Sequence, residues 1–261
     1  MNILEQIIAK KKKEVEESRH CTPISEFKKE SFFKNRCFDF KKHLLREDKT
    51  GIIAEFKRRS PSKGIINDDA NIINVAEDYT KYGASAISVL TDEEFFGGSL
   101  SDIMYAMGEI PVLRKDFIID EYQLFESKAA GADVILLIAA CLDKKEVKYL
   151  ATTAKNIGLN VLLEIHNEQE LDHICDDVHV VGVNNRDLKT FTVDVNRSIE
   201  LGKKIPADKI KISESGIDDV ATIRLLQQHG FKGFLIGEKF MKEKSPGDAF
   251  KNFVEELNKE K

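Results

Sequence analysis

Gly51-Ile-Ile-Ala-Glu-Phe-Lys-Arg-Arg-Ser-Pro-Ser-Lys-Gly64 decides the fold, because an apolar run typical of a buried strand stops abruptly at charged residues. Side chains two apart on a strand point to the same side, so Glu55 and Lys57 project together while Phe56 turns the other way. Alone, this pattern fits a surface ion pair beside a Ser-Pro turn equally well. It recurs along the chain, however, which favours a strand end that carries chemistry.

Similar apolar runs follow the first one, and most of them also stop at polar residues. They cover residues 85–91, 111–116, 133–140, 159–166, 179–185, 209–215 and 233–238. The stretches between them have helical character; in residues 120–131, apolar side chains recur every three or four positions and Gly131 closes the end. Each unit spans roughly 25 residues, enough for a right-handed crossover between parallel strands. Eight such units predict an α/β fold of the closed (β/α)8, or TIM barrel, type.

An open doubly wound sheet is the alternative, but it requires a glycine-rich G-x-G-x-x-G turn that residues 51–64 lack. The 261 residues are close to the roughly 250 typical of one barrel. We therefore expect one domain over residues 1–261, of which residues 1–50 form an N-terminal helical extension. Residues 2–19 predict an amphipathic helix. Five phenylalanines after it are expected to pack against the barrel: Phe27, Phe32, Phe33, Phe38 and Phe40.

Composition excludes several classes of protein. The basic run at residues 10–13 precedes three glutamates, which predicts a solvated helix face, and the net charge of -5 argues against a nucleic-acid partner. No apolar stretch has the length of a membrane span, and the N-terminus lacks the features of a signal peptide, so we expect a cytoplasmic protein. The four cysteines and six histidines show no metal-binding spacing, which predicts reduced cysteines and no metal.

Active sites of (β/α)8 barrels lie at the carboxyl ends of the strands, so the residues at those ends are the candidates. Any one of them could simply face water, but charged groups that end five strands of one barrel converge by geometry. The candidates are Glu55, Lys57, Lys115, Glu164, Asn184, Arg186, Glu214 and Ser215.

Two glycines near the ends of the last strands indicate a second feature. Gly216 and Gly237 allow backbone N–H groups to approach a ligand closely, although they could also serve tight turns alone. The loops after the last two strands commonly bind phosphate in this fold. The pattern therefore predicts a phosphorylated small-molecule substrate.

The chain resembles the indole-3-glycerol-phosphate synthase family over its whole length. The most specific matches are the E-x-K-x-x-S-P-S pattern from Glu55 and the N-N-R-D-L pattern from Asn184. Further matches are Leu113-Arg-Lys-Asp-Phe117, Leu163-Glu-Ile-His166 and Ser213-Glu-Ser-Gly216. The resemblance implies ring closure of 1-(2-carboxyphenylamino)-1-deoxyribulose 5-phosphate in tryptophan biosynthesis, with loss of carbon dioxide and water and without a cofactor.

The resemblance also implies catalytic roles. Lys115 matches the general acid that protonates the substrate ketone, and Glu164 and Glu55 suit the later proton transfers. Which glutamate serves which transfer stays open. Lys57 matches a residue between the reacting centre and the anionic ends of the substrate, and Asn184 a polar contact to the substrate.

Binding roles follow in the same way. Ser60 and Arg186 suit the carboxylate, Phe117 and Leu136 the aromatic ring, and Glu214 is a further substrate contact. Ser215, Gly216, Gly237 and Glu238 match the phosphate site. Glu238 stands where many relatives carry serine, and since a carboxylate repels phosphate we expect its side chain to turn to solvent, leaving the N–H groups in place.

Two alternatives remain: another phosphate-binding barrel enzyme, such as a sugar-phosphate isomerase or a Schiff-base aldolase, and a non-catalytic phosphate-binding barrel. A monomer, a homodimer and association with other tryptophan-pathway enzymes are all compatible with the sequence.

Overall fold

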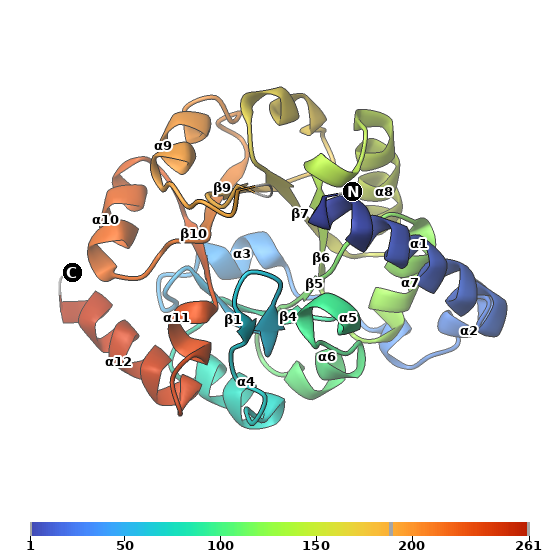
Figure 1. Ribbon diagram of the computed structural model, residues 1–261, viewed down its shortest axis with the longest axis horizontal. Coiled ribbons are helices and arrows are strands. Elements are labelled where there is room, and N and C mark those ends of the chain that lie inside the picture. The colour runs from blue at the N-terminus through green and yellow to red at the C-terminus, as the bar shows by residue number, and fades with distance from the viewer. Residues whose placement is uncertain (1, 188–189, 260–261) are drawn as a thin grey trace.

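Eight parallel strands close into a barrel in the computed structural model, which describes residues 2–187 and 190–259 (Figure 1). Strands that follow one another along the chain pair side by side, and the last pairs with the first. They are β1 (Ile52–Phe56), β4 (Ala86–Leu90), β5 (Val112–Lys115), β6 (Val134–Ile138), β7 (Asn160–Ile165), β8 (Val180–Asn184), β9 (Ile210–Glu214) and β10 (Gly233–Ile236). The predicted fold class and all eight predicted strands are confirmed.

Alternation along the strands separates two apolar cores. Ile53, Leu113 and Leu162 belong to the cluster inside the barrel. Ile52 and Phe56 belong to the larger cluster between the strands and the helices. Polar residues at the strand ends with the inner parity therefore point into the barrel mouth.

Helices cover the outside of the barrel (Figure 1). They are α4 (Ile72–Lys81), α5 (Glu93–Phe96), α6 (Ser101–Ala106), α7 (Glu121–Ala129), η2 (Ala139–Cys141), α8 (Lys144–Asn156), η3 (Glu168–His173), α9 (Asn196–Gly202), α10 (Val220–Gln228), α11 (Glu238–Met241) and α12 (Pro246–Lys259). Helix α7 lies where residues 120–131 predict it. A capping box between Asp120 and Gln123 starts it, and Gly131, at a φ of 94°, follows its end.

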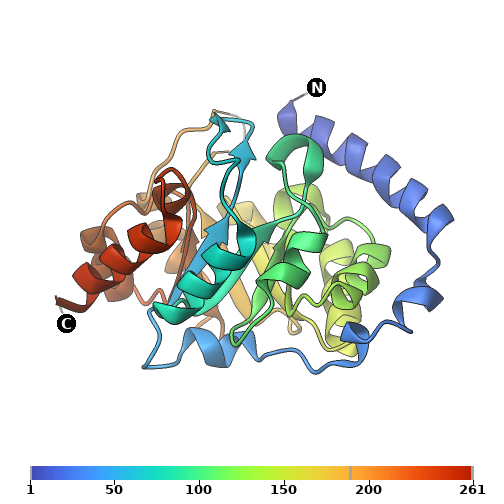
Figure 2. The same ribbon diagram turned by 90° about the horizontal axis from the view of Figure 1, so that it is seen from below.

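The first fifty residues wrap one flank of the barrel. They form α1 (Ile3–Cys21), α2 (Ile24–Phe27), η1 (Phe32–Lys34) and α3 (Phe40–Leu44). In Figure 2, α1 lies on the upper side of the barrel and α3 on the lower side. Phe40 and Leu44 of α3 are buried in the inner core cluster. The extension therefore reaches both ends of the barrel.

The phenylalanines of the extension pack as predicted with one clear exception. Phe27 and Phe33 contact Tyr122 and Phe125 of α7, at 5.2 and 6.0 Å between ring centroids. Phe38, in contrast, is 37% exposed. Its backbone N–H donates to Asp133 at 2.8 Å and its carbonyl accepts from Asn160 at 2.8 Å. These bonds fix the backbone while the ring faces outward, so packing of Phe38 against the barrel was a wrong prediction.

The basic run at residues 10–13 is also not wholly a solvated face. Lys10, Lys12 and Lys13 are exposed, but Lys11 is only 5% exposed. Lys11 lies one helical turn from both Ile7 and Val15, on the buried face of α1. Its ammonium pairs with Asp92 at 3.0 Å and Asp116 at 3.1 Å. The prediction of a solvated face is therefore wrong for this residue.

A small hairpin follows β1 that the sequence analysis did not predict. Strands β2 (Arg59–Ser60) and β3 (Gly64–Ile65) pair antiparallel. Arg58, just before the hairpin, forms a two-bond pair with Asp102 at 2.5 and 3.0 Å. This anchor fixes the hairpin on the same side of the barrel as α1 (Figure 2). Within residues 2–187 and 190–259, no helix is long and apolar enough to cross a membrane.

Candidate active site

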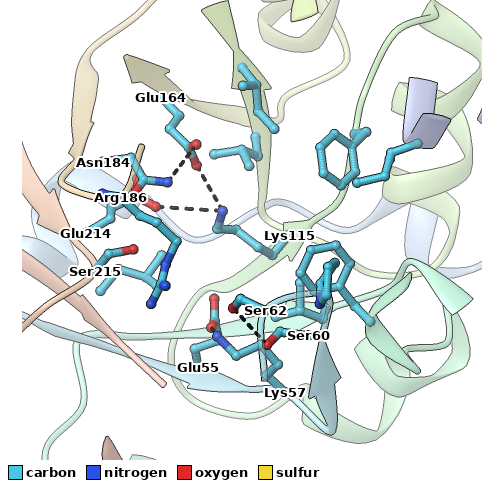
Figure 3. Close-up of a pocket in the computed structure, with 18 of the residues that line it drawn as sticks. Glu55, Lys57, Ser60, Ser62, Lys115, Glu164, Asn184, Arg186, Glu214 and Ser215 are labelled. Carbon is cyan, nitrogen blue, oxygen red and sulfur yellow. Dashed lines mark hydrogen bonds and ion pairs between the residues drawn. The ribbon is translucent and has the colours of Figure 1, made fainter. Parts of the chain in front are cut away.

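One pocket at the carboxyl ends of the strands gathers most of the predicted site residues (Figure 3). It is lined by Glu55, Lys57, Ser60, Lys115, Phe117, Leu136, Glu164, Asn184, Arg186, Glu214, Ser215 and Glu238. Gly216 and Gly237 are not among the described lining residues, but each is the chain neighbour of one. Leu188, the last residue of the N-N-R-D-L pattern, lies outside the described residues.

Lys115 and Glu164 form the central pair of the pocket. Lys115 Nζ donates to Glu164 Oε2 at 2.9 Å, and Asn184 donates to Glu164 Oε1 at 3.0 Å (Figure 3). Burial alone would lower the pKa of Lys115, but the charges of Glu164, Glu214 and Glu55 outweigh it and raise that pKa. Burial opposes ionisation of Glu164 as well, yet Lys115 and His166 hold its pKa well below the usual range. The pair is therefore an ammonium and a carboxylate.

Glu214 has a different environment. It is 2% exposed, and its Oε2 lies 3.7 Å from Lys115 Nζ. Its Oε1 accepts no hydrogen bond from the described part of the chain. Burial, and next the charge of Glu164, raise the pKa of Glu214. Gly182 makes room for this carboxyl group, because a Cβ there would lie 2.2 Å from Glu214 Oε1.

Glu55 and Lys57 project together, as the strand alternation predicts. Lys57 Nζ lies 2.8 Å from Glu55 Oε1 (Figure 3). Phe56 turns to the outer core. A Cβ at Gly237 would lie 2.6 Å from Glu55 Oε1 and 2.9 Å from its Cβ. Gly237 therefore allows Glu55 to lie close against the end of β10.

His166 and Glu170 lie behind Glu164, and the sequence analysis gave neither a role. His166 Nε2 is 3.1 Å from Glu164 Oε1, and its Nδ1 is 3.3 Å from Glu170 Oε2. All three side chains are buried. The position of His166, two residues after Glu164, signals that both face the same side, but its partner Glu170 comes from η3, which no strand pattern reveals.

The chain turns sharply at the end of β9. Ser215 and Gly216 both have left-handed backbones, at φ of 68° and 71°. Such a backbone is strained for serine and typical of functional sites. Asn185 holds the turn by donating to Ser213 Oγ at 3.0 Å and to the carbonyl of Ser215 at 2.9 Å. The second asparagine of the N-N-R-D-L pattern is thus structural, whereas Asn184 faces the pocket.

Glu238 does not turn away from the pocket, contrary to the expectation from sequence. Its side chain is 37% exposed and lies 3.4 Å from Lys63 Nζ and 3.9 Å from Arg186 Nη2. Lys63 is at the tip of the β2–β3 hairpin and Arg186 follows β8. These two cations attract the carboxylate to the pocket mouth, and this attraction explains the wrong prediction.

Apolar side chains form the other wall of the pocket. The rings of Phe96 and Phe117 lie 6.1 Å apart between centroids. Helix α1 adds Ile3, Leu4 and Ile7, whereas the sequence predicted only an amphipathic helix here and no part in the pocket. Within residues 2–187 and 190–259, no group of three or more histidine, cysteine or acidic side chains is placed to hold a metal.

The closed barrel and its buried acid–base centre define the chain as a (β/α)8-barrel enzyme. A profile described as Indole-3-glycerol phosphate synthase matches residues 4–253. The chain belongs to the indole-3-glycerol phosphate synthase family.

Two relatives bearing that name cover almost the whole chain. The protein from Bacteroides thetaiotaomicron is 46% identical over 98% of this chain and 99% of its own length. The protein from Alkaliphilus metalliredigens is 44% identical over 95% of this chain and 97% of its own length.

Solved structures with low identity share the fold alone. The tryptophan synthase complex from Pyrococcus furiosus contains a chain with a TM-score of 0.60 at 17% identity, covering 81% of this chain and 99% of that one. KGPDC from Streptococcus mutans gives a TM-score of 0.60 at 13% identity, covering 80% and 97%.

Proposed function

We propose that this pocket catalyses the ring closure of 1-(2-carboxyphenylamino)-1-deoxyribulose 5-phosphate to indole-3-glycerol phosphate, with Lys115 as the general acid. Membership of the family makes the chain a carboxy-lyase of tryptophan biosynthesis that acts on a phosphorylated small molecule. The observation that carries the residue assignment is the Lys115 ammonium, which is 15% exposed and lies between Glu164 and Glu214 at the centre of the pocket.

The first step requires a proton donor. The ring carbon that bears the carboxylate attacks the ketone carbon, and negative charge develops on the ketone oxygen. An ammonium in a dry pocket stabilises this charge and can transfer a proton to it. Lys115 suits this role because its neighbouring carboxylates keep it protonated. The second step needs no such donor, since the substrate's own iminium accepts the electron pair when carbon dioxide leaves.

The last step removes a hydroxyl group as water together with a proton. A carboxylate must accept that proton, and Glu164 and Glu55, which both line the pocket, suit this role. Glu164 is the stronger candidate for the transfers that involve Lys115, because the two side chains are hydrogen-bonded. Glu55 bonds to Lys57 instead and suits the departing hydroxyl.

The two ends of the substrate match the two sides of the pocket. The aromatic ring fits the wall that contains Phe117 and Leu136, and its carboxylate suits Ser60 and Arg186. The phosphate suits the backbone at Ser215 and at Gly216, Gly237 and Glu238, where loops meet at the ends of β9 and β10.

A Schiff-base aldolase is a weaker proposal on physical grounds. Such an enzyme needs an unprotonated lysine, whose pKa must be lowered. The carboxylates around Lys115 raise its pKa instead.

Fluorescence of the indole product tests the proposal directly, because the chain has no tryptophan and gives little background. Purified protein mixed with the carboxyphenylamino substrate should give a rising signal. Lys115→Met should lose this signal, while the binding of inorganic phosphate should persist because its contacts lie on other strands. Lys232→Met, at an exposed position, is the matched control. A Lys115→Met variant that keeps near wild-type turnover would remove Lys115 from the mechanism.

Three further expectations belong to the same proposal. They are a single domain over residues 1–261, a cytoplasmic location, and function as a monomer or homodimer that has no nucleic-acid partner. Cell fractionation checks the location, and sedimentation checks the oligomeric state.

A further inference from the structure

A buried row of three side chains extends behind the catalytic pair. Glu164, His166 and Glu170 are 2%, 9% and 8% exposed. His166 lies between the carboxylates: its Nδ1 is hydrogen-bonded to Glu170 at 3.3 Å, and its Nε2 lies at an ion-pair distance of 3.1 Å from Glu164, without hydrogen-bond geometry. His166 is not among the described residues that line the pocket, whereas Glu164, its neighbour, is.

Glu170 fixes the imidazole in place. Its Oε2 also accepts the backbone N–H of His166 at 2.7 Å, and its Oε1 accepts from Asn167 at 2.5 Å. Asn167 in turn caps η3, the short helix that carries Glu170. Both the ring and the backbone of His166 are therefore tied to one carboxylate.

The charges around this row favour an imidazolium. Burial would lower the pKa of His166, but its contacts with Glu164 and Glu170 outweigh burial and raise that pKa to about 9. Two charged groups lie beyond Glu164: Lys115, which pairs with that carboxylate at 2.9 Å, and Glu214 on β9, which lies 3.7 Å from Lys115. Cys141 of η2 interacts with Glu164 and Glu170, and burial raises the pKa of its thiol to about 12, so the thiol stays neutral.

Glu164 therefore has cations on both sides. Lys115 faces it from the pocket, and His166 faces it from behind. A general base must be ionised and correctly oriented at the moment of proton transfer. Lys115 takes part in the proposed chemistry. His166 stays behind the Glu164 carboxylate when Lys115 gives up its proton.

We propose that His166 is a positioning residue: held by Glu170, its imidazolium orients the Glu164 carboxylate toward Lys115 and keeps it ionised during turnover. This inference rests on the proposed role of Glu164. It assigns to η3, which lies outside the pocket, a part in setting the pH range of the reaction.

The dependence of kcat on pH tests the proposal. His166→Asn should move the acidic limb of the profile to higher pH by about one to three units, the usual effect of one nearby opposite charge. Activity should recover toward the wild-type value at high pH, and KM should change little because His166 does not line the pocket. Glu170→Gln should move the limb in the same direction by less, since it keeps the imidazole but removes one of its carboxylates.

His173→Asn is the matched control. His173 lies in η3, the helix that carries Glu170. Its ring nitrogens bond to the carbonyls of Glu170 and Leu142 and do not contact Glu164. The dependence of kcat on pH in His173→Asn should overlay that of the wild type. A kcat lowered by one factor at every pH in His166→Asn would show a merely structural role and overturn the inference.

Nuclear magnetic resonance gives a readout without activity. The imidazole signal lost in His166→Asn should titrate near pH 9 in the wild type and at lower pH in Glu170→Gln. Titration near the ordinary value of about 6.5 would overturn the inference even if ring closure is established. Absence of ring closure in a wild type whose His166 titrates near pH 9 would instead count against the proposed function.

Discussion

Glu55, Glu164 and Glu214 are three carboxyl groups in one small pocket, and each has different neighbours. Glu55 pairs with Lys57, Glu164 has Lys115 on one side and His166 on the other, and Glu214 is partly unpaired. Neighbouring cations lower the pKa of Glu164, whereas burial raises that of Glu214. Environment therefore moves the pKa values of two carboxyl groups of the same type in opposite directions.

Glu238 is a residue whose effect on affinity can be predicted. Its carboxylate engages Lys63 and Arg186 at the pocket mouth, close to the proposed phosphate site. Glu238→Gln should lower KM for the phosphorylated substrate by roughly twofold to fivefold, since a partly exposed charge contributes modestly and the repulsion of phosphate is removed. Steady-state kinetics at low and high salt measures this effect, which should shrink at high salt.

Glu243→Gln makes the same change of charge at an exposed position just after α11 and should leave KM unchanged. A higher KM in Glu238→Gln would mean that Glu238 instead holds the two cations in their productive places.

Helix α1 acts as an element of the pocket and not only as a cover. Its buried Lys11 joins two loops, through Asp92 and Asp116. Asp92 also caps α5, which carries Phe96, and Asp116 directly precedes Phe117. A single ammonium therefore links α1 to the two loops that carry Phe96 and Phe117.

Lys11→Met should weaken substrate binding and stability together. Removing Lys11 leaves the buried Asp92 without its cation, whereas Asp116 keeps Arg114 at 3.0 Å, and we expect a loss of about 3 kcal/mol in the free energy of unfolding. KM should rise severalfold because the apolar wall loosens, while kcat changes less. Urea denaturation and steady-state kinetics measure the two effects, with exposed Lys12→Met as the control. An unchanged KM in a destabilised Lys11→Met variant would mean that Lys11 stabilises the fold but does not affect substrate binding.

Stability of the whole molecule should depend on pH through His166. The folded state raises the pKa of this group from 6.5 to about 9. Between these values the folded protein holds a proton that the unfolded chain releases, so the contribution is complete below pH 6.5 and is lost as pH rises through 9.

The free energy of unfolding should consequently fall between about pH 7 and pH 9, by on the order of 3 kcal/mol from this group. Urea denaturation at several pH values measures it, and His166→Asn should show a flatter dependence. Parallel curves for the two proteins would contradict the assignment.

The barrel was predictable because most of the strands combine an apolar run with polar residues at the end, as Ile53 and Glu55 illustrate. What was missed depends on partners distant in sequence. Lys11 looks like part of a charge run until Asp92 and Asp116 are seen beside it. The β2–β3 hairpin has strands of two residues, too short for any periodic signal.

Phe40 and Leu44 fill the lower end of the barrel with the inner core. In the described part of the chain, the packed interior leaves the upper mouth as the way both in and out. Substrate and product must then use the same opening, so we expect added product to compete with the substrate for the free pocket.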